Sequence, residues 1–187
     1  MKVRIFTTLA AFMFLLGAAP APAPAPQPAA STGFKHDPKL DVFGYYIPTP
    51  ELKIGKWMLT SLNIGTPQDF VDWEKGKRDP PEYAPLMIEF ADVTSPQVQN
   101  ELGGSNYSSQ RRVLPTAYAL AGNRLSFIGK DAVLGAVAFT GTLDPAAVKR
   151  ATAAASESTD TSIVLTGELT VGTRVIRHVK FTWFGGD

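Results

Sequence analysis

The sequence predicts a mainly β protein, built as a single antiparallel β-barrel or β-sandwich with one or two short helices. Three observations lead to this prediction. Apolar and polar residues alternate along residues 163–183, which is the period of a strand with one buried face. The chain has 16 glycines and 15 prolines, as a turn-rich protein does. About seven or eight segments rich in β-branched and aromatic residues follow one another, separated by turn residues.

Residues 1–18 predict a secretory signal peptide. Lys2 and Arg4 precede an apolar run from Ile5 to Leu16, and small residues follow. This is the layout of a cleaved signal, and the run is short for a membrane span. An uncleaved N-terminal anchor is the alternative. We therefore expect a periplasmic or secreted protein that has no transmembrane span after cleavage.

Residues 19–40 predict a disordered Pro/Ala-rich linker, and residues 41–187 the β domain. Prolines alternate with alanines from Pro20 to Pro26. Because proline fixes its own φ and restricts the residue before it, such a run favours an extended polyproline spacer. The chain has no cysteine. An exported domain without disulfides must be held together by its core alone, and thiol chemistry is excluded.

The first half of the domain predicts three strands and a helix. Residues 41–50 are aromatic and end in prolines, as a short edge strand does, and residues 51–65 predict a longer strand. Thr66 and Pro67 are a suitable N-cap and first residue for a short helix that Gly76 would end. Residues 84–93 alternate as a strand, and the polar residues 94–110 predict a loop.

The second half predicts further strands, a helix and a closing hairpin. Residues 111–122 read as a strand that Pro115 interrupts, and strands follow at 123–130 and 132–144. Asp144 and Pro145 start an alanine-rich helix. A hairpin with its turn at Gly172 and Thr173 ends the chain. Its predicted inward residues are Ile163, Leu165, Leu169, Val171, Val175, Val179, Phe181 and Trp183.

The hairpin sequence "LTGELTVGTRVIRHVKF", residues 165–181, resembles that of the lipocalin-like periplasmic proteins that bind polyisoprenoids. In that family a Leu-Thr-Gly tripeptide, an acid and Leu-Thr lead through a glycine turn to a basic, β-branched strand. The resemblance covers about 17 of 187 residues. The family's N-terminal pattern is not visible in this chain, and in the family more strands follow the hairpin. The resemblance implies a calycin-like barrel with an apolar interior.

Charge and composition exclude several classes of function. Lys and Arg total 18 and Asp and Glu total 17, so no basic field would attract nucleic acid. The two histidines, His36 and His178, are too few and too far apart to predict a metal centre, and no calcium-loop pattern occurs. We therefore expect neither a metal nor a cofactor.

Aromatic and basic residues are the candidates for ligand binding. In the loop "GGSNYSSQRR", Tyr107 can stack on a ligand, and Arg111 and Arg112 can hold an anion or a sugar. Aromatic side chains elsewhere would line either the core or an apolar cavity. The complete candidate set is Tyr45, Trp57, Tyr107, Arg111, Arg112, His178 and Trp183.

These features favour a non-catalytic domain of the cell envelope. Its ligand would be an apolar small molecule or lipid, a glycan, or an envelope protein. The alternative is a secreted hydrolase that uses carboxylates brought together by the fold. The candidate carboxylates are Asp69, Asp72 and Glu74 on the predicted helix, and Glu89 and Asp92 near the end of a strand. The sequence leaves open whether the protein is an enzyme.

Overall fold

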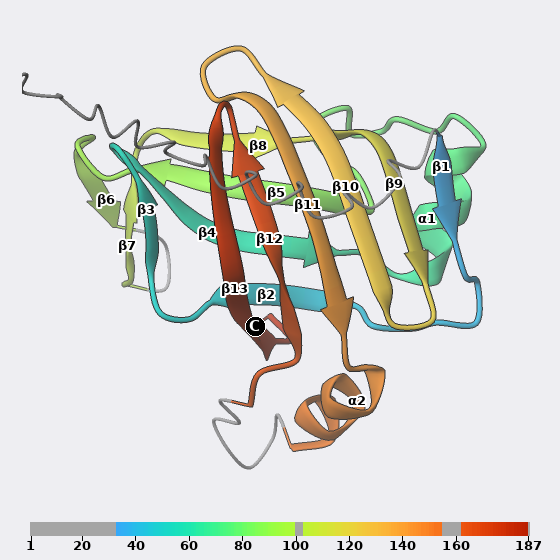
Figure 1. Ribbon diagram of the computed structural model, residues 1–187. Coiled ribbons are helices and arrows are strands. Elements are labelled where there is room, and N and C mark those ends of the chain that lie inside the picture. The colour runs from blue at the N-terminus through green and yellow to red at the C-terminus, as the bar shows by residue number, and fades with distance from the viewer. Residues whose placement is uncertain (1–32, 100–102, 155–161, 187) are drawn as a thin grey trace, which may run out of the picture.

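A computed structural model describes residues 33–99, 103–154 and 162–186. The described part of the chain is mainly β and contains two helices, as predicted. Most of its strands form one large sheet that curls into an open half-barrel (Figure 1). The predicted signal peptide and most of the predicted linker lie outside the described residues.

The large sheet is antiparallel except at one edge, where β1 and β9 run parallel. In pairing order its strands are β1 (Phe34–His36), β9 (Pro115–Ala121), β10 (Arg124–Asp131), β11 (Gly135–Leu143), β12 (Leu165–Val171), β13 (Arg174–Phe184), β2 (Gly44–Pro48), β4 (Trp57–Ile64), β5 (Leu86–Asp92) and β8 (Gln110–Val113). The short strand β3 (Leu52–Ile54) also pairs with β4. A separate two-stranded sheet consists of β6 (Gln97–Gln99) and β7 (Ser105–Tyr107).

Large aromatic side chains fill the inside of the curled sheet. Alternate residues of each strand point to this side, because successive side chains of a strand face opposite ways. The largest of them are fully buried: Tyr46, Phe90, Tyr118, Phe127, Phe139 and Phe181. Phe139 and Phe181 meet edge to face, with ring centroids 5.6 Å apart. The interior is therefore a packed core.

The break at Pro115 separates two strands, as the sequence predicts. β8 pairs with β5 at one edge of the sheet, and β9 pairs with β10 near the other edge. Leu114 is the only residue between β8 and β9. Because so short a connection joins strands from the two ends of the sheet, it holds the sheet in its curled form.

The closing hairpin is confirmed, but its side chains do not keep one alternation to the end. β12 and β13 pair around the turn at Gly172. The register shifts between Gly167 and Leu169, opposite His178, whose φ is +57°. A bulge of this kind reverses the faces of the strand. Ile176 therefore pairs with Leu169, while Val175, predicted to face inward, is exposed.

Both predicted helices form and carry the predicted caps. In α1 (Pro67–Glu74), the Asp69 amide donates to the hydroxyl of Thr66, and the Asp69 carboxylate accepts from the Thr66 amide at 2.7 Å. In α2 (Pro145–Ala154), the Ala147 amide donates to the carboxylate of Asp144 at 3.0 Å. No helix among the described residues is long and apolar enough to cross a bilayer.

Two N-terminal segments differ from the predictions. The segment predicted as one strand at 51–65 is the hairpin of β3 and β4, because Gly55 takes a φ of +63° that suits a tight turn. Strand β1 lies inside the range predicted as linker, so the ordered domain starts before residue 41. β1 pairs with β9, and His36 Nδ1 lies 2.8 Å from Glu74 Oε1 in α1.

Candidate functional site

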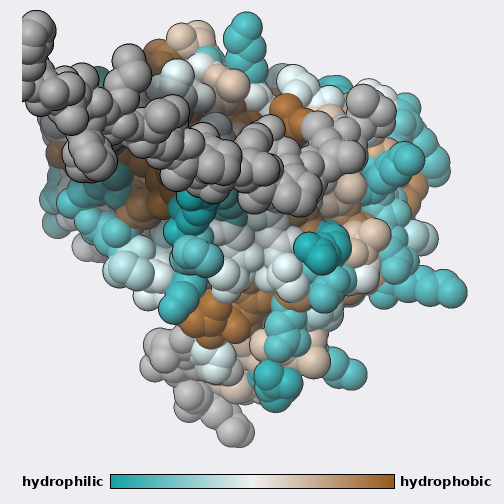
Figure 2. Space-filling model, viewed as in Figure 1, coloured by the Kyte–Doolittle hydropathy of each residue, from teal (hydrophilic) through white to brown (hydrophobic). Residues whose placement is uncertain are grey.

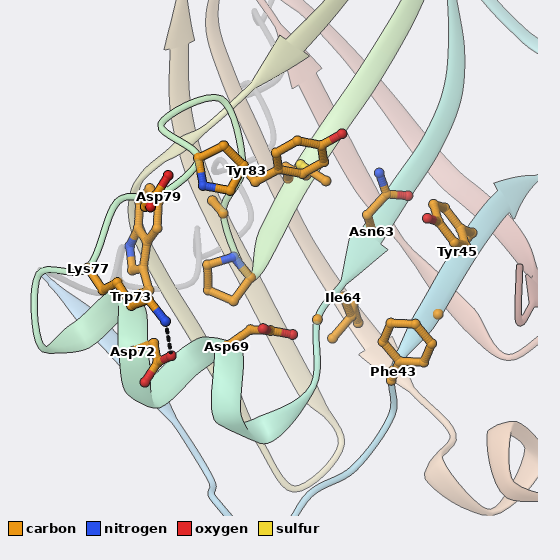
Figure 3. Close-up of a pocket in the computed structure, with 16 residues that line it drawn as sticks. Phe43, Tyr45, Asn63, Ile64, Asp69, Asp72, Trp73, Lys77, Asp79 and Tyr83 are labelled. Carbon is orange, nitrogen blue, oxygen red and sulfur yellow. Dashed lines mark hydrogen bonds and ion pairs between the residues drawn. The ribbon is translucent and has the colours of Figure 1, made fainter.

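A half-open pocket of about 340 Å³ lies beside α1 (Figure 3). Its walls come from α1, from the loop at residues 77–85, from the adjoining ends of β4 and β5, and from the start of β2. Ligand pockets of proteins usually measure about 300–1,000 Å³. The pocket is therefore large enough for a small molecule or for one or two units of a larger ligand.

One side of the pocket is acidic. Asp69, Asp72 and Asp79 line it together with a single cation, Lys77. Asp72 accepts hydrogen bonds from Lys77 Nζ at 3.0 Å and from Gln68 Nε2 at 2.7 Å. Both bonds lower the pKa of the Asp72 carboxyl, and the bond from Lys77 has the larger effect. Asp72 is therefore ionised at neutral pH. Figure 3 shows the Lys77–Asp72 contact on the helix side of the pocket.

Aromatic rings form the opposite rim. The exposed fractions of Phe43, Tyr45 and Tyr83 are 43%, 39% and 47%, which is high for large aromatic residues. The Arg112 guanidinium lies over the Tyr83 ring at 4.3 Å. The indole of Trp183 donates to the Phe43 carbonyl at 2.9 Å and so fixes the start of β2.

The aromatic rim continues onto the surface beyond the pocket. The Tyr45 ring lies 6.3 Å from that of Phe184, which is also exposed. Figure 2 shows an apolar area in the lower part of the view, between α2 and the region where Figure 1 places the end of β13. The pocket is therefore continuous with an aromatic surface through Tyr45.

Two residues of the pocket wall have buried side-chain polar atoms without hydrogen-bond partners in the described part of the chain. In the described part of the chain, only three residues carry such side-chain atoms: His36, Asn63 and Trp73. Asn63 and Trp73 both line the pocket and are only 6% exposed. His36 contacts Glu74, the last residue of α1. Unpaired buried polar atoms are rare in folded proteins, and each requires an explanation.

The structure does not bring all seven predicted ligand-binding residues together. Tyr45 lines the pocket, while Arg112 and Trp183 contact residues of its rim. Arg111 lies over the ring of the buried Trp57, at 5.9 Å, on another part of the sheet. The remaining two lie elsewhere: Tyr107 is in β7, and His178 is exposed at the bulge of β13.

The carboxylates considered for catalysis are held by other groups. Glu89 accepts from Arg112 Nε and from the Ser61 hydroxyl. Glu74 accepts a hydrogen bond from the Tyr118 hydroxyl at 3.1 Å. Burial is the main cause that raises the pKa of this hydroxyl, and the negative charge of Glu74 is the second. Asp69 forms the helix cap described above. Among the described residues, no group of three or more His, Asp or Glu side chains could hold a metal ion.

Several pocket residues were not predicted, although the sequence contains signals for them. Asn63 is a polar residue in the otherwise apolar strand end "SLNIG". The stretch from Trp73 to Tyr83 mixes aromatic and acidic residues with prolines, as a binding loop does. Phe43 lies in the segment 41–50, which reads only as an edge strand.

A second hollow of about 570 Å³ lies over β9 to β12. Small side chains line it, including Ala119, Thr140 and Gly141. A Cβ on Gly141 would lie 2.7 Å from the Phe139 ring, so core packing already explains this glycine. The second hollow therefore offers less evidence of a ligand than the pocket beside α1.

Comparisons of the chain with protein-family models, curated proteins and solved structures found no match. The geometry of the pocket is therefore the basis for assigning a function.

Proposed function

We propose that the protein is an exported, non-catalytic domain that binds a glycan in the pocket beside α1. The observation that carries this proposal is the buried, unpaired amide of Asn63, a residue of the pocket wall. Burying such atoms without partners costs about 1–3 kcal/mol each. A bound ligand with polar groups in the right places would remove that cost.

The remaining wall residues fit a sugar better than other small molecules. The C–H faces of a sugar ring can pack flat on exposed rings such as Tyr83 and Phe43. Its hydroxyl groups can donate to carboxylates and can both donate to and accept from an amide. Since three aspartates face one lysine, the pocket would repel an acidic sugar. We therefore expect a neutral or amino sugar.

A lipid ligand has less support. Lipid tails need an enclosed apolar space, but packed aromatic side chains such as Phe90 and Phe127 fill the inside of the sheet. The pocket beside α1 is half-open and has charged walls.

The hydrolase alternative also has less support from the site. A glycosidase needs a general acid with a raised pKa facing a second carboxylate. Here Lys77 and Gln68 lower the pKa of Asp72, and Asp69 is engaged in the helix cap. Incubation of glycans with the protein provides the check, because any release of shorter sugars would favour the alternative.

Binding to an array of neutral, amino and acidic glycans tests the proposal. We expect binding to a neutral or amino glycan, and roughly a tenfold weaker affinity for Tyr83→Ala, because one stacking ring is lost. Tyr107→Ala is the matched control, since Tyr107 does not line the pocket, and its affinity should be unchanged. Failure of the wild type to bind any glycan would overturn the proposed function.

Export is part of the same proposal and is supported by the composition of residues 1–18. Intact-mass measurement of the protein isolated from its host should show a chain that begins between Ala18 and Ser31. A mature protein that retains Met1 to Leu16 would contradict export by a cleaved signal.

A further inference from the structure

Asn63 occupies an unusual position on the outer face of the sheet. It lies in β4, directly opposite Tyr45 of β2 and Met87 of β5. Side chains directly opposite on neighbouring strands share a face and lie about 4.5–5.5 Å apart. All three residues line the pocket. The Asn63 amide therefore stands between an aromatic ring and a thioether.

Nothing in the described part of the fold uses the amide of Asn63. Both Nδ2 and Oδ1 are buried and have no hydrogen-bond partner there. A leucine has nearly the same shape and would avoid the loss of solvation that these two atoms suffer. The fold would therefore be at least as stable with an apolar residue at this position. An asparagine that only destabilises the fold points to a role in binding.

The two amide atoms restrict the chemistry of the partner. A primary amide presents a donor, Nδ2, and an acceptor, Oδ1, side by side. Neighbouring hydroxyl groups on one sugar ring match this pair, because one oxygen can accept while the other donates. A carboxylate would only accept, and an ammonium group would only donate, so either would leave one amide atom unpaired.

Access to the amide depends on one neighbour. Met87 is buried, whereas the Tyr45 side chain is partly exposed and lies close to Phe184 on the outer surface. Of the two side chains that flank Asn63, Tyr45 is the one with space to move. Rotation of its ring would open a path from the pocket to the amide.

We propose that Asn63 determines specificity by binding two neighbouring hydroxyl groups of a sugar ring, and that Tyr45 turns aside to admit them. This inference rests on the proposed glycan-binding function. It adds that the glycan must carry two neighbouring hydroxyl groups, and it assigns their recognition to Asn63. Phe43 and Tyr83 would contribute stacking, whereas Asn63 would distinguish sugars by their hydroxyl groups.

The first test substitutes Asn63→Leu and measures affinity for the array-selected glycan by calorimetry, together with the melting temperature. We expect at least a tenfold loss of affinity, with a melting temperature equal to or above that of the wild type. Asn106→Leu, the same substitution at an exposed residue of β7 that does not line the pocket, should keep wild-type affinity. Wild-type affinity of Asn63→Leu would overturn the inference while leaving the proposed function intact.

The second test uses the wild-type protein, so it does not depend on how any variant folds. Periodate cleaves the carbon–carbon bond between neighbouring hydroxyl groups and leaves two aldehydes. The periodate-oxidised glycan should bind at least about tenfold more weakly than the untreated one. Equal binding of the two glycans would overturn the diol requirement alone. A wild type that binds no glycan would overturn both the inference and the proposed function.

The third test concerns Tyr45 and needs no ligand. Hydrogen exchange of the Asn63 side-chain amide, followed by NMR, should be at least about tenfold faster in Tyr45→Ala than in the wild type, because the ring shields the amide. Tyr107→Ala is the control, because Tyr107 lies in β7 and does not line the pocket, and it should leave this exchange rate nearly unchanged. Equal exchange in the wild type and Tyr45→Ala would overturn the role of Tyr45.

Discussion

Asp92 shows how a single carboxylate can stabilise the end of a strand. Its Oδ2 atom accepts from Lys56 Nζ at 2.6 Å, and its Oδ1 atom accepts from the hydroxyl and the amide of Thr94. The bond from Lys56 is the largest cause that lowers the pKa of Asp92 from 3.8 to about 2. The Lys56 bond ties the end of β5 to the turn between β3 and β4, and the two Thr94 bonds fix the residues that follow β5.

The pH dependence of Asp92→Asn follows from that lowered pKa. The ionised carboxylate stabilises the folded state above pH 3.8, and this stabilisation is lost as the pH falls through about 2. Urea unfolding should show the variant less stable than the wild type at pH 7, with the difference shrinking toward pH 2. Gln99→Ala, at an exposed uncharged residue of β6, is the control and should show no such trend. A difference that is the same at every pH would contradict the prediction.

At the level of single residues, the sequence predicts which side chains of a strand face inward and outward better than it predicts where a bulge interrupts this alternation. Phe181 and Lys180 face inward and outward as their alternation indicates. The bulge at His178 gives no comparable signal, because a positive φ at a non-glycine residue depends on the partner strand. The orphaned amide of Asn63 likewise depends on Tyr45 and Met87, which the sheet brings beside it from other parts of the sequence.

At the level of elements, local signals predict α1 well and β1 not at all. Thr66, Pro67 and Asp69 form the start of α1 through bonds within four residues of each other, which a sequence pattern contains. β1 has only three residues, and its parallel pairing with β9 joins segments more than eighty residues apart. Phe34 lies 5.1 Å from the Tyr118 ring and 6.1 Å from that of Trp73. Only these distant partners make β1 an ordered strand.

Removal of β1 should therefore destabilise the domain. A variant that begins at Asp41 should lose about 3 kcal/mol or more of unfolding free energy relative to one that begins at Gly33, because it loses Phe34 packing and the His36–Glu74 contact. Phe34→Ala should cost about 2 kcal/mol, and Lys35→Ala, on the exposed side, about 0.5 kcal/mol or less. Urea unfolding measures all four proteins. Equal stability of the two truncated variants would show that β1 is dispensable.

At the level of the whole molecule, the pocket could not be predicted because two separate stretches of chain, residues 43–45 and 63–87, build it. They meet through the pairing of β2 with β4, which local sequence patterns do not specify. The sequence predicts each of these segments individually, but it does not indicate that Phe43 and Tyr83 form one rim. The mainly β class was predictable because it depends on many local alternations, whereas the pocket depends on their arrangement.

The last strand holds the two parts of the large sheet together. β13 pairs with β12 on one side and with β2 on the other. β9 to β12 thus belong to one part, and β2, β4, β5 and β8 to the other. Residues 181–184 provide all the pairing with β2. Phe181 is 1% exposed and packs on Phe139, whereas Trp183 is half-buried.

Deletion of residues 179–187 should prevent folding, because it separates the two parts of the sheet and opens the core. Phe181→Ala should lower the unfolding free energy by about 3–5 kcal/mol, as for other buried aromatic residues. Trp183→Ala should cost less because its side chain is only half-buried, and Lys180→Ala, on the exposed face, about 0.5 kcal/mol or less. Soluble yield and thermal unfolding of the four variants provide the measurement. If the deletion variant folds normally, or if Phe181 is no more sensitive than Lys180, β13 does not join the two parts of the sheet, and β8, Leu114 and β9 alone would have to connect them.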